Sequence, residues 1–115
     1  MSKTYSLNIL GSKWKLKVVP RYTDPMFETV DGYTDRSVRT MYVAETSTNT
    51  IDDLKDWPEY QKVVKRHEII HAFFFESGLA QDMYHPAYGH DEQAIDHLAI
   101  LFPKMEEVFK KAEAL

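Results

Sequence analysis

The chain has 115 residues, of which 43% are hydrophobic, so it can bury a core and fits a single domain over residues 1–115. It contains no cysteine, which excludes disulfide bonds and thiolate metal sites, and its net charge of −4, with 14 basic and 18 acidic residues mixed along the chain, argues against a nucleic-acid partner. No apolar run is long enough to cross a bilayer and the first residues lack a signal-peptide pattern, so we expect no membrane partner and a cytoplasmic location.

The first part of the chain shows the alternation of a half-buried sheet. Residues 5–10 alternate loosely between apolar and polar side chains, residues 11–12 offer a turn, and residues 13–18 alternate between lysine and an apolar residue. This pattern predicts a β-hairpin whose second strand turns its lysines outward. Pro20 ends that strand, because proline has no N–H to donate to a ladder.

Turn-forming residues dominate the segment that follows. Residues 21–30 show little periodicity and are predicted to be mostly loop, while residues 31–32 and 34–37 have the composition of turns. Residues 40–44 are rich in strand-forming side chains and predict a third strand. We therefore expect an α+β fold, with a small sheet of about three strands packed on helices from the second half of the chain.

A long helix is predicted over residues 57–77. Asp56 is its expected N-cap, with Glu59 three residues on as in a capping box, and Pro58 suits a first helical turn. Gly78 is the expected stop. The helix is apolar on nearly all sides, which is typical of a helix buried in the middle of a domain.

Two histidines and a glutamate interrupt this apolar helix. His67-Glu68-Ile69-Ile70-His71 is an H-E-x-x-H motif. Residues four apart lie one above the other on a helix, so His67 and His71 can bind one metal ion from a single element. Glu68 lies about 100° further round, where it can act on a metal-bound water without being a ligand. The motif predicts a zinc hydrolase, most simply a peptidase.

A second helix is predicted from about residue 91 to residue 102, after a mostly loop segment over residues 79–90. Pro103 is expected to start or kink a final helical segment. Glu92 and Asp96 lie four apart on one face of the second helix, beside small apolar residues. This pattern is typical of a helix that faces a metal site.

The expected metal is a catalytic zinc ion. Such an ion commonly takes three protein ligands and one water, and two histidines with a glutamate are one of the usual ligand sets. We predict one Zn²⁺ held by His67, His71 and Glu92. Glu68 is the predicted general base, which takes a proton from the water and passes it to the leaving amine. Imidazole and carboxylate ligands also accept other divalent ions, so the sequence does not restrict the site to zinc.

Other polar residues are candidates for supporting roles. Asp96 is predicted to accept a hydrogen bond from the second ring nitrogen of a ligand histidine, while Asp91 competes for the helix cap and could replace Glu92 as ligand. His97 is expected to be a surface or packing residue. Four loop residues could each donate a hydrogen bond to the oxyanion formed during hydrolysis, and the sequence does not choose among Tyr84, His85, Tyr88 and His90.

These motifs and their spacing resemble those of the gluzincin zinc metallopeptidases, in which a helix Glu is the third ligand and an Asp one turn later orients a ligand His. Residues 66–79 (RHEIIHAFFFESGL) and 91–103 (DEQAIDHLAILFP) further resemble small phage-type proteins related to the ImmA/IrrE metallopeptidases. The resemblance covers the C-terminal half well and the N-terminal strands only loosely.

The resemblance implies a compact zincin-like core. It would contain a small antiparallel sheet, an active-site helix with the H-E-x-x-H motif and a second ligand-bearing helix. The edge strand of the sheet would pair with an extended peptide or protein substrate, the binding mode called β-augmentation. Residues 40–44 are the candidate for that edge.

Two other functions are compatible with these residues. The first is a metal-stabilised zincin-fold binding or regulatory protein of phage origin, without peptidase turnover. The second is a metal-free structural protein in which both histidines are packed. The sequence leaves open the substrate and the oligomeric state.

Overall fold

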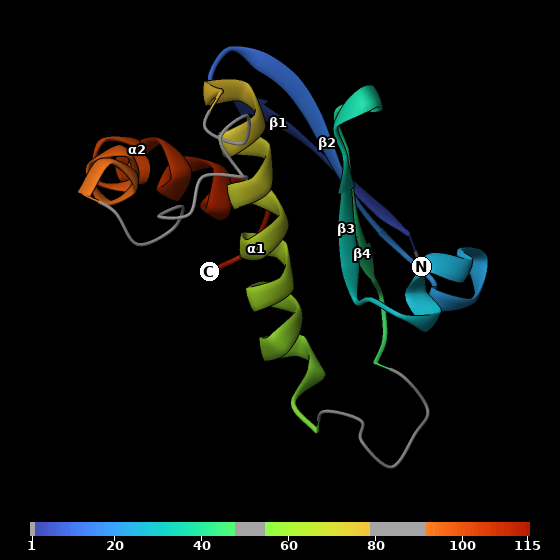
Figure 1. Cartoon of the computed structure of the whole chain (residues 1–115). Helices are drawn as coiled ribbons and strands as arrows, with labels where there is room; N and C mark the ends of the chain where they lie inside the picture. Colours follow the sequence, from blue (N-terminus) through green and yellow to red (C-terminus); the bar gives the residue numbers. More distant parts are fainter. Residues whose placement is uncertain (1, 48–54, 79–91) are drawn as a thin grey trace.

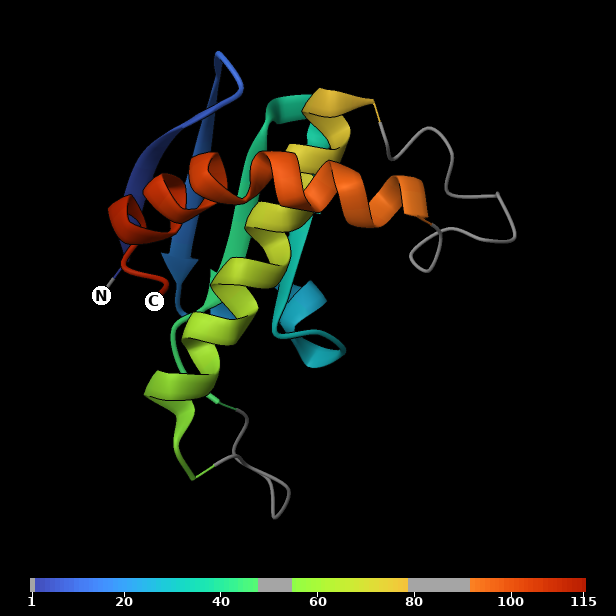
Figure 2. The same cartoon turned by 90° about the vertical axis from the view of Figure 1, so that its left-hand side faces the viewer.

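The computed structural model describes residues 2–47, 55–78 and 92–115 and confirms the predicted α+β class (Figure 1). One helix lies against one side of a four-stranded sheet, and a second helix crosses the first helix (Figures 1 and 2). No helix within the described ranges is long and apolar enough to pass through a membrane. The strands and helices are β1 (Lys3–Ile9), β2 (Ser12–Val19), β3 (Gly32–Asp35), β4 (Thr40–Ala44), α1 (Trp57–Ser77) and α2 (Glu92–Lys111).

The sheet is mixed, with the strand order β1-β2-β4-β3. β1 and β2 form the predicted antiparallel hairpin, and β4 is the predicted third strand, but β4 pairs with β2 in parallel. β3 then pairs antiparallel with β4. The expectation of a three-stranded antiparallel sheet is therefore wrong. Residues 20–39 are long enough for the crossover that a parallel pair requires, and they also supply the fourth strand.

The position of β4 corrects a second expectation. β4 lies between β2 and β3, so both of its edges are paired and it cannot accept an added peptide strand. Within the described part of the chain, the outer strands of the sheet are β1 and β3. The peptide-pairing edge predicted at residues 40–44 is therefore wrong.

Alternation along β2 places the core on one face of the sheet. Trp14, Leu16 and Val18 are 1%, 0% and 6% exposed, whereas Lys13 and Lys15 are exposed, so the outward lysines are confirmed. The apolar side chains pack with those of β4 and α1 in a single core. This buried face is the one that α1 covers.

The bounds of α1 agree with the sequence prediction. The Asp56 carboxylate accepts a hydrogen bond from the backbone N–H of Glu59 at 3.3 Å, which confirms the N-cap. Gly78 ends the helix in the left-handed conformation, with φ of 86°, a region that glycine enters without a steric cost. Local capping chemistry thus determines where the motif-bearing helix begins and ends.

The helical segment predicted after Pro103 is present, but α2 continues through Pro103 to Lys111 as one helix, so the predicted end near residue 102 is wrong. A proline inside a helix costs about 3 kcal/mol. Leu101, Met105 and Phe109 lie on the buried face of α2, at 5%, 3% and 7% exposure. Burial of such side chains contributes roughly 1.5–3 kcal/mol each, which outweighs the cost of the proline.

Two basic residues of α1 hold the C-terminal end of α2. Lys65 is only 5% exposed, and its Nζ donates to the carbonyl oxygens of Ala112 at 3.1 Å and Glu113 at 3.2 Å. The Arg66 guanidinium donates to the carbonyl oxygen of Ala114 at 2.7 Å. Positive charge is favourable at the carbonyl end of a helix, so these contacts fix α2 against α1.

Glu76 joins the last turn of α1 to the sheet. Its carboxylate accepts hydrogen bonds from Arg39 Nε at 2.7 Å, Trp14 Nε1 at 2.8 Å and Ser12 Oγ at 3.0 Å. These bonds, that from Arg39 first, hold the pKa of Glu76 below its ordinary value. The contact fixes the C-terminal end of the motif-bearing helix.

Replacing Glu76 with glutamine is expected to lower the free energy of unfolding by about 1–2 kcal/mol at neutral pH, because the charge-assisted bonds are lost. The pKa of Glu76 is depressed in the folded protein, so its contribution is present above about pH 4.5 and is lost as the pH falls through the folded value. Urea unfolding measures the difference. Glu107→Gln, at an exposed position of α2, is the control; equal stability of Glu76→Gln and the wild type would contradict the prediction.

Candidate metal and catalytic site

His67 and His71 lie one turn apart on α1 and approach each other closely. Their Nε2 atoms are 3.2 Å apart, and their ring centroids are 4.8 Å apart with 74° between the planes. Both residues are exposed. A tetrahedral zinc ion with Zn–N bonds of about 2.05 Å separates two nitrogen ligands by about 3.3 Å. In the structure this contact is a hydrogen bond between the two rings, and its length is close to the spacing of two nitrogen ligands on one tetrahedral ion.

The histidine pair lies between two neighbouring parts of the fold. On one side Glu68 contacts β3, through a hydrogen bond from Thr34. On the other side the Phe74 ring lies 6.2 Å from the ring of His97 on α2. With 3.6 residues per turn, His71 falls between Glu68 and Phe74 around the helix. The pair thus faces solvent between the β3 side and the α2 side of α1.

Glu68 is buried, at 5% exposure. Its Oε1 accepts a hydrogen bond from Thr34 Oγ1 at 2.7 Å, and its charge acts to raise the pKa of His71, so the carboxylate lies near the pair. In the described residues we find no donor to Oε2 of Glu68. One oxygen of the carboxylate is therefore held by the sheet.

The pKa of His71 is lowered from its ordinary value. The largest cause is partial desolvation of the ring, which disfavours the charged form although the residue keeps contact with solvent. The Glu68 carboxylate acts in the opposite direction, and His67 reinforces the lowering. The result favours the neutral imidazole at pH 7, which is the form that binds a metal.

The metal-free protein is expected to lose stability as the pH falls below about 6.5, because the unfolded chain then takes up a proton that folded His71 resists. Above about pH 6.5 the His71 ring is largely neutral in both the folded and the unfolded protein, so its protonation no longer favours unfolding. Melting temperatures in EDTA between about pH 7.5 and pH 5.5 test the expectation. His71→Ala should decline less steeply than the wild type, and equal slopes would contradict the assignment.

Aromatic and cationic groups extend the site along α1. The Phe75 ring stacks on His71 at a centroid distance of 6.2 Å and an interplanar angle of 22°. The Arg36 guanidinium lies over the same Phe75 ring, 5.6 Å from its centroid. Sequence reasoning missed Thr34 and Arg36, because both fall in a segment with the composition of turns. The pairing of β3 with β4 brings Thr34 to α1, and Arg36 follows directly in the 3₁₀ helix Arg36–Val38.

Several predicted site residues lie beyond what the structure describes. Glu92 is the first residue of α2, but the side chains of Glu92 and Asp96 are outside the described set. The candidate oxyanion donors and the alternative ligand are also outside the described residues: Tyr84, His85, Tyr88, His90 and Asp91. In the described part of the chain no three His, Asp or Glu side chains form a metal-binding group. The third ligand therefore stays a prediction.

His97 is a packing histidine, as the sequence predicted. Its Nε2 lies 2.9 Å from Ser77 Oγ, and its ring is half-buried against Phe74. These contacts join the N-terminal half of α2 to the last turn of α1. The hydrogen bond and the burial account for this histidine without a metal.

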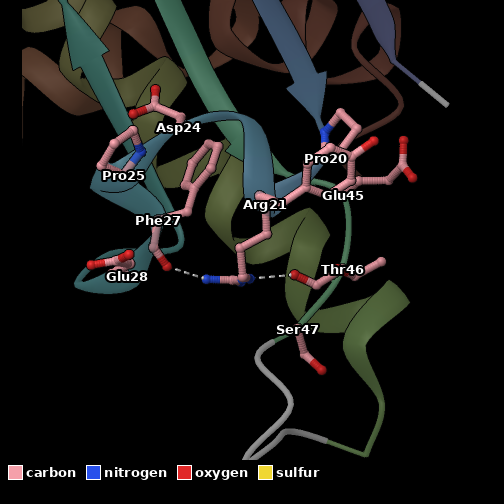
Figure 3. A pocket seen from close by; sticks show the side chains of 10 residues that line it. Pro20, Arg21, Asp24, Pro25, Phe27, Glu28, Glu45, Thr46 and Ser47 are labelled. Carbon is pink, nitrogen blue, oxygen red and sulfur yellow. Dashed lines mark hydrogen bonds between the residues drawn. The ribbon is translucent and has the colours of Figure 1, made fainter.

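A separate cleft of about 570 Å³ opens beside the short 3₁₀ helices Arg21–Thr23 and Pro25–Glu28 (Figure 3). Its central cation, Arg21, donates to the carbonyl oxygens of Phe27 at 2.7 Å and Thr46 at 2.9 Å, and to the Asp31 carboxylate at 2.9 Å. The guanidinium thus ties these loops together. None of the predicted site residues lines this cleft.

Comparison of the chain with known protein families, with curated proteins and with solved structures finds no match.

Proposed function

We propose that this protein is a zinc-dependent peptidase with a zincin-like fold, which binds one ion through His67, His71 and Glu92. The observation that carries the proposal is the 3.2 Å separation of the two Nε2 atoms, close to the spacing that a tetrahedral ion requires. The neutral form favoured at His71 supports it further. The resemblance of residues 66–79 and 91–103 to phage-type metallopeptidases points to the same reaction.

The donor set suits a catalytic zinc ion. Two imidazoles and one carboxylate leave a coordination position open, as hydrolytic sites do, and the absence of cysteine disfavours a closed structural site. When bound, zinc would supply Lewis-acid chemistry: it lowers the pKa of a coordinated water and polarises the scissile carbonyl. Other divalent ions remain compatible with these ligands.

Glu68 is the proposed general base. Its carboxylate accepts a proton from the attacking water and returns it to the amine that leaves. Burial and the bond from Thr34 limit the movement of the carboxylate. A restricted base needs little rearrangement to reach the geometry of reaction, which favours catalysis.

The substrate that fits this fold best is an extended peptide or an unfolded protein segment. Among the described strands, β3 pairs with β4 alone, and it lies beside α1 at the position of Glu68. An extended chain that pairs with the other side of β3 would therefore run close to the histidine pair. In this proposal β3 takes the role that the sequence assigned to residues 40–44.

The test is to purify the protein without added metal, measure bound metal ions per chain, and assay cleavage of an unstructured protein. We expect about one zinc ion, cleavage that stops with chelator, and recovery when zinc is returned. A chain free of metal that also fails to take up zinc would overturn the proposal. The variants that separate binding from turnover are those at Glu68 and His71.

A metal-stabilised binding or regulatory protein is the second candidate. The observation in its favour is that Glu68 already has a partner in the sheet, so the carboxylate also fulfils a structural role. This alternative predicts that chelation lowers the melting temperature while no substrate is cleaved. Metal-dependent cleavage that is lost in Glu68→Gln would exclude it.

A further inference from the structure

Successive residues of β3 direct their backbone N–H and C=O groups alternately toward β4 and away from it. The carbonyl oxygen of Asp31 accepts a hydrogen bond from the N–H of Ala44 at 2.9 Å, and Tyr33 is opposite Tyr42 in the register. In an antiparallel pair, alternate residues turn their N–H and C=O groups toward the partner. The backbone groups of Gly32 and Thr34 therefore point away from β4. They lie on the edge to which no described strand is paired.

The side chain of Thr34 points to α1. Its Oγ1 donates to Glu68 Oε1 at 2.7 Å, so the same residue contacts the buried carboxylate and presents its backbone at the open edge. Gly32 allows this close packing, because a Cβ at that position would lie 2.7 Å from Val64 Cγ1 and 3.4 Å from Glu68 Cγ. β3 and the Glu68 turn of α1 are therefore in direct contact, and a shift of one would displace the other.

We propose that Thr34 is a positioning residue, which couples the pairing of a peptide with the open edge of β3 to the orientation of the Glu68 carboxylate. The proposal rests on the function proposed for Glu68. Peptide hydrogen bonds to the backbone of Thr34 fix this residue in the strand, and its hydroxyl fixes Oε1 of Glu68. Oε2 is then directed to the water that attacks the peptide in the same register.

The experiment compares Thr34→Val with Thr34→Ser in the zinc-loaded protein. Valine keeps the shape and backbone but lacks the hydroxyl, whereas serine keeps the hydroxyl. We expect kcat to fall about 10- to 100-fold in Thr34→Val, the size typical for loss of a group that supports a catalytic residue, with KM and zinc content unchanged. Thr34→Ser should restore kcat to within a few-fold of the wild type.

Thr4→Val is the matched control, because Thr4 is exposed on β1, at the opposite edge of the sheet. It should leave kcat unchanged. Melting temperatures identify any loss of folding, and Thr34→Ala replaces the valine variant if that variant does not fold. A purely structural role would lower stability and the amount of active protein without a rescue by serine.

The outcomes separate the two proposals. If the wild type hydrolyses peptides and Thr34→Val keeps its kcat, the role of Thr34 is wrong while the peptidase assignment stands. Equal losses of kcat in the valine and serine variants also overturn that role, since the hydroxyl then does not matter. A wild type that binds zinc but hydrolyses nothing overturns the peptidase proposal, and the role of Thr34 with it.

Discussion

Glu68→Gln is expected to reduce kcat by about 10²- to 10⁴-fold, the range over which a general base contributes to catalysis. Glutamine has nearly the same shape as glutamate and keeps a carbonyl oxygen that can accept the hydrogen bond from Thr34. It cannot take a proton from water. The change therefore removes the proposed chemistry while it preserves the packing of α1 against β3.

The measurement is a comparison of kcat, KM and bound zinc between the wild type and Glu68→Gln. Zinc content and KM should be unchanged, because Glu68 is not a proposed ligand. Glu107→Gln makes the same change on the exposed surface of α2 and should leave all three quantities alone. If Glu68→Gln cleaves as fast as the wild type, Glu68 is not the base, even where zinc remains bound.

The elements that could be predicted are those whose signals are local in the sequence. The alternation of residues 13–18 predicted β2 with its lysines outward, and Asp56 and Gly78 marked the ends of α1. Each signal depends on a few neighbouring residues and on the period of the backbone. The position of His67 and His71 on one face of α1 follows in the same way from their spacing of one turn.

The topology of the sheet depends on contacts between distant residues. β3 has only four residues, begins with glycine and ends with aspartate, so its composition favours a turn. Pairing with β4 and contact with Glu68 of α1 make it a strand. The parallel pairing of β2 with β4 leaves no signature in either strand. An antiparallel three-stranded sheet was therefore the simplest expectation, and it was wrong.

The candidate site divides in the same way. The H-E-x-x-H spacing predicted the histidine pair, but the contact of Thr34 with Glu68 spans 34 positions in the sequence and needs the fold. At Pro103 the local signal misleads. The proline favours a break in the helix, but burial of the apolar face of α2 stabilises a helix that continues through it. The assignments of Glu92 and Asp96 stay predictions, because those side chains are outside the described residues.

His71→Ala is expected to weaken zinc binding by at least about 100-fold. Loss of a residue that only supports a ligand already costs roughly 10- to 100-fold in metal affinity, so loss of a ligand should cost no less. The imidazole Nε2 of His71 lies 3.2 Å from that of His67, and one histidine alone cannot chelate the ion from two points. The substitution itself should leave the fold intact, because the side chain of His71 is exposed.

Competition with a chelator of known affinity measures this loss, and the melting temperature with and without zinc provides a second readout. A 100-fold weaker affinity removes about 2.7 kcal/mol of zinc-dependent stabilisation when zinc is in excess. His97→Ala is the matched control, since His97 bonds to Ser77 and should leave zinc affinity unchanged. If His71→Ala binds zinc as tightly as the wild type, the metal lies elsewhere and the histidine pair of α1 has a structural role.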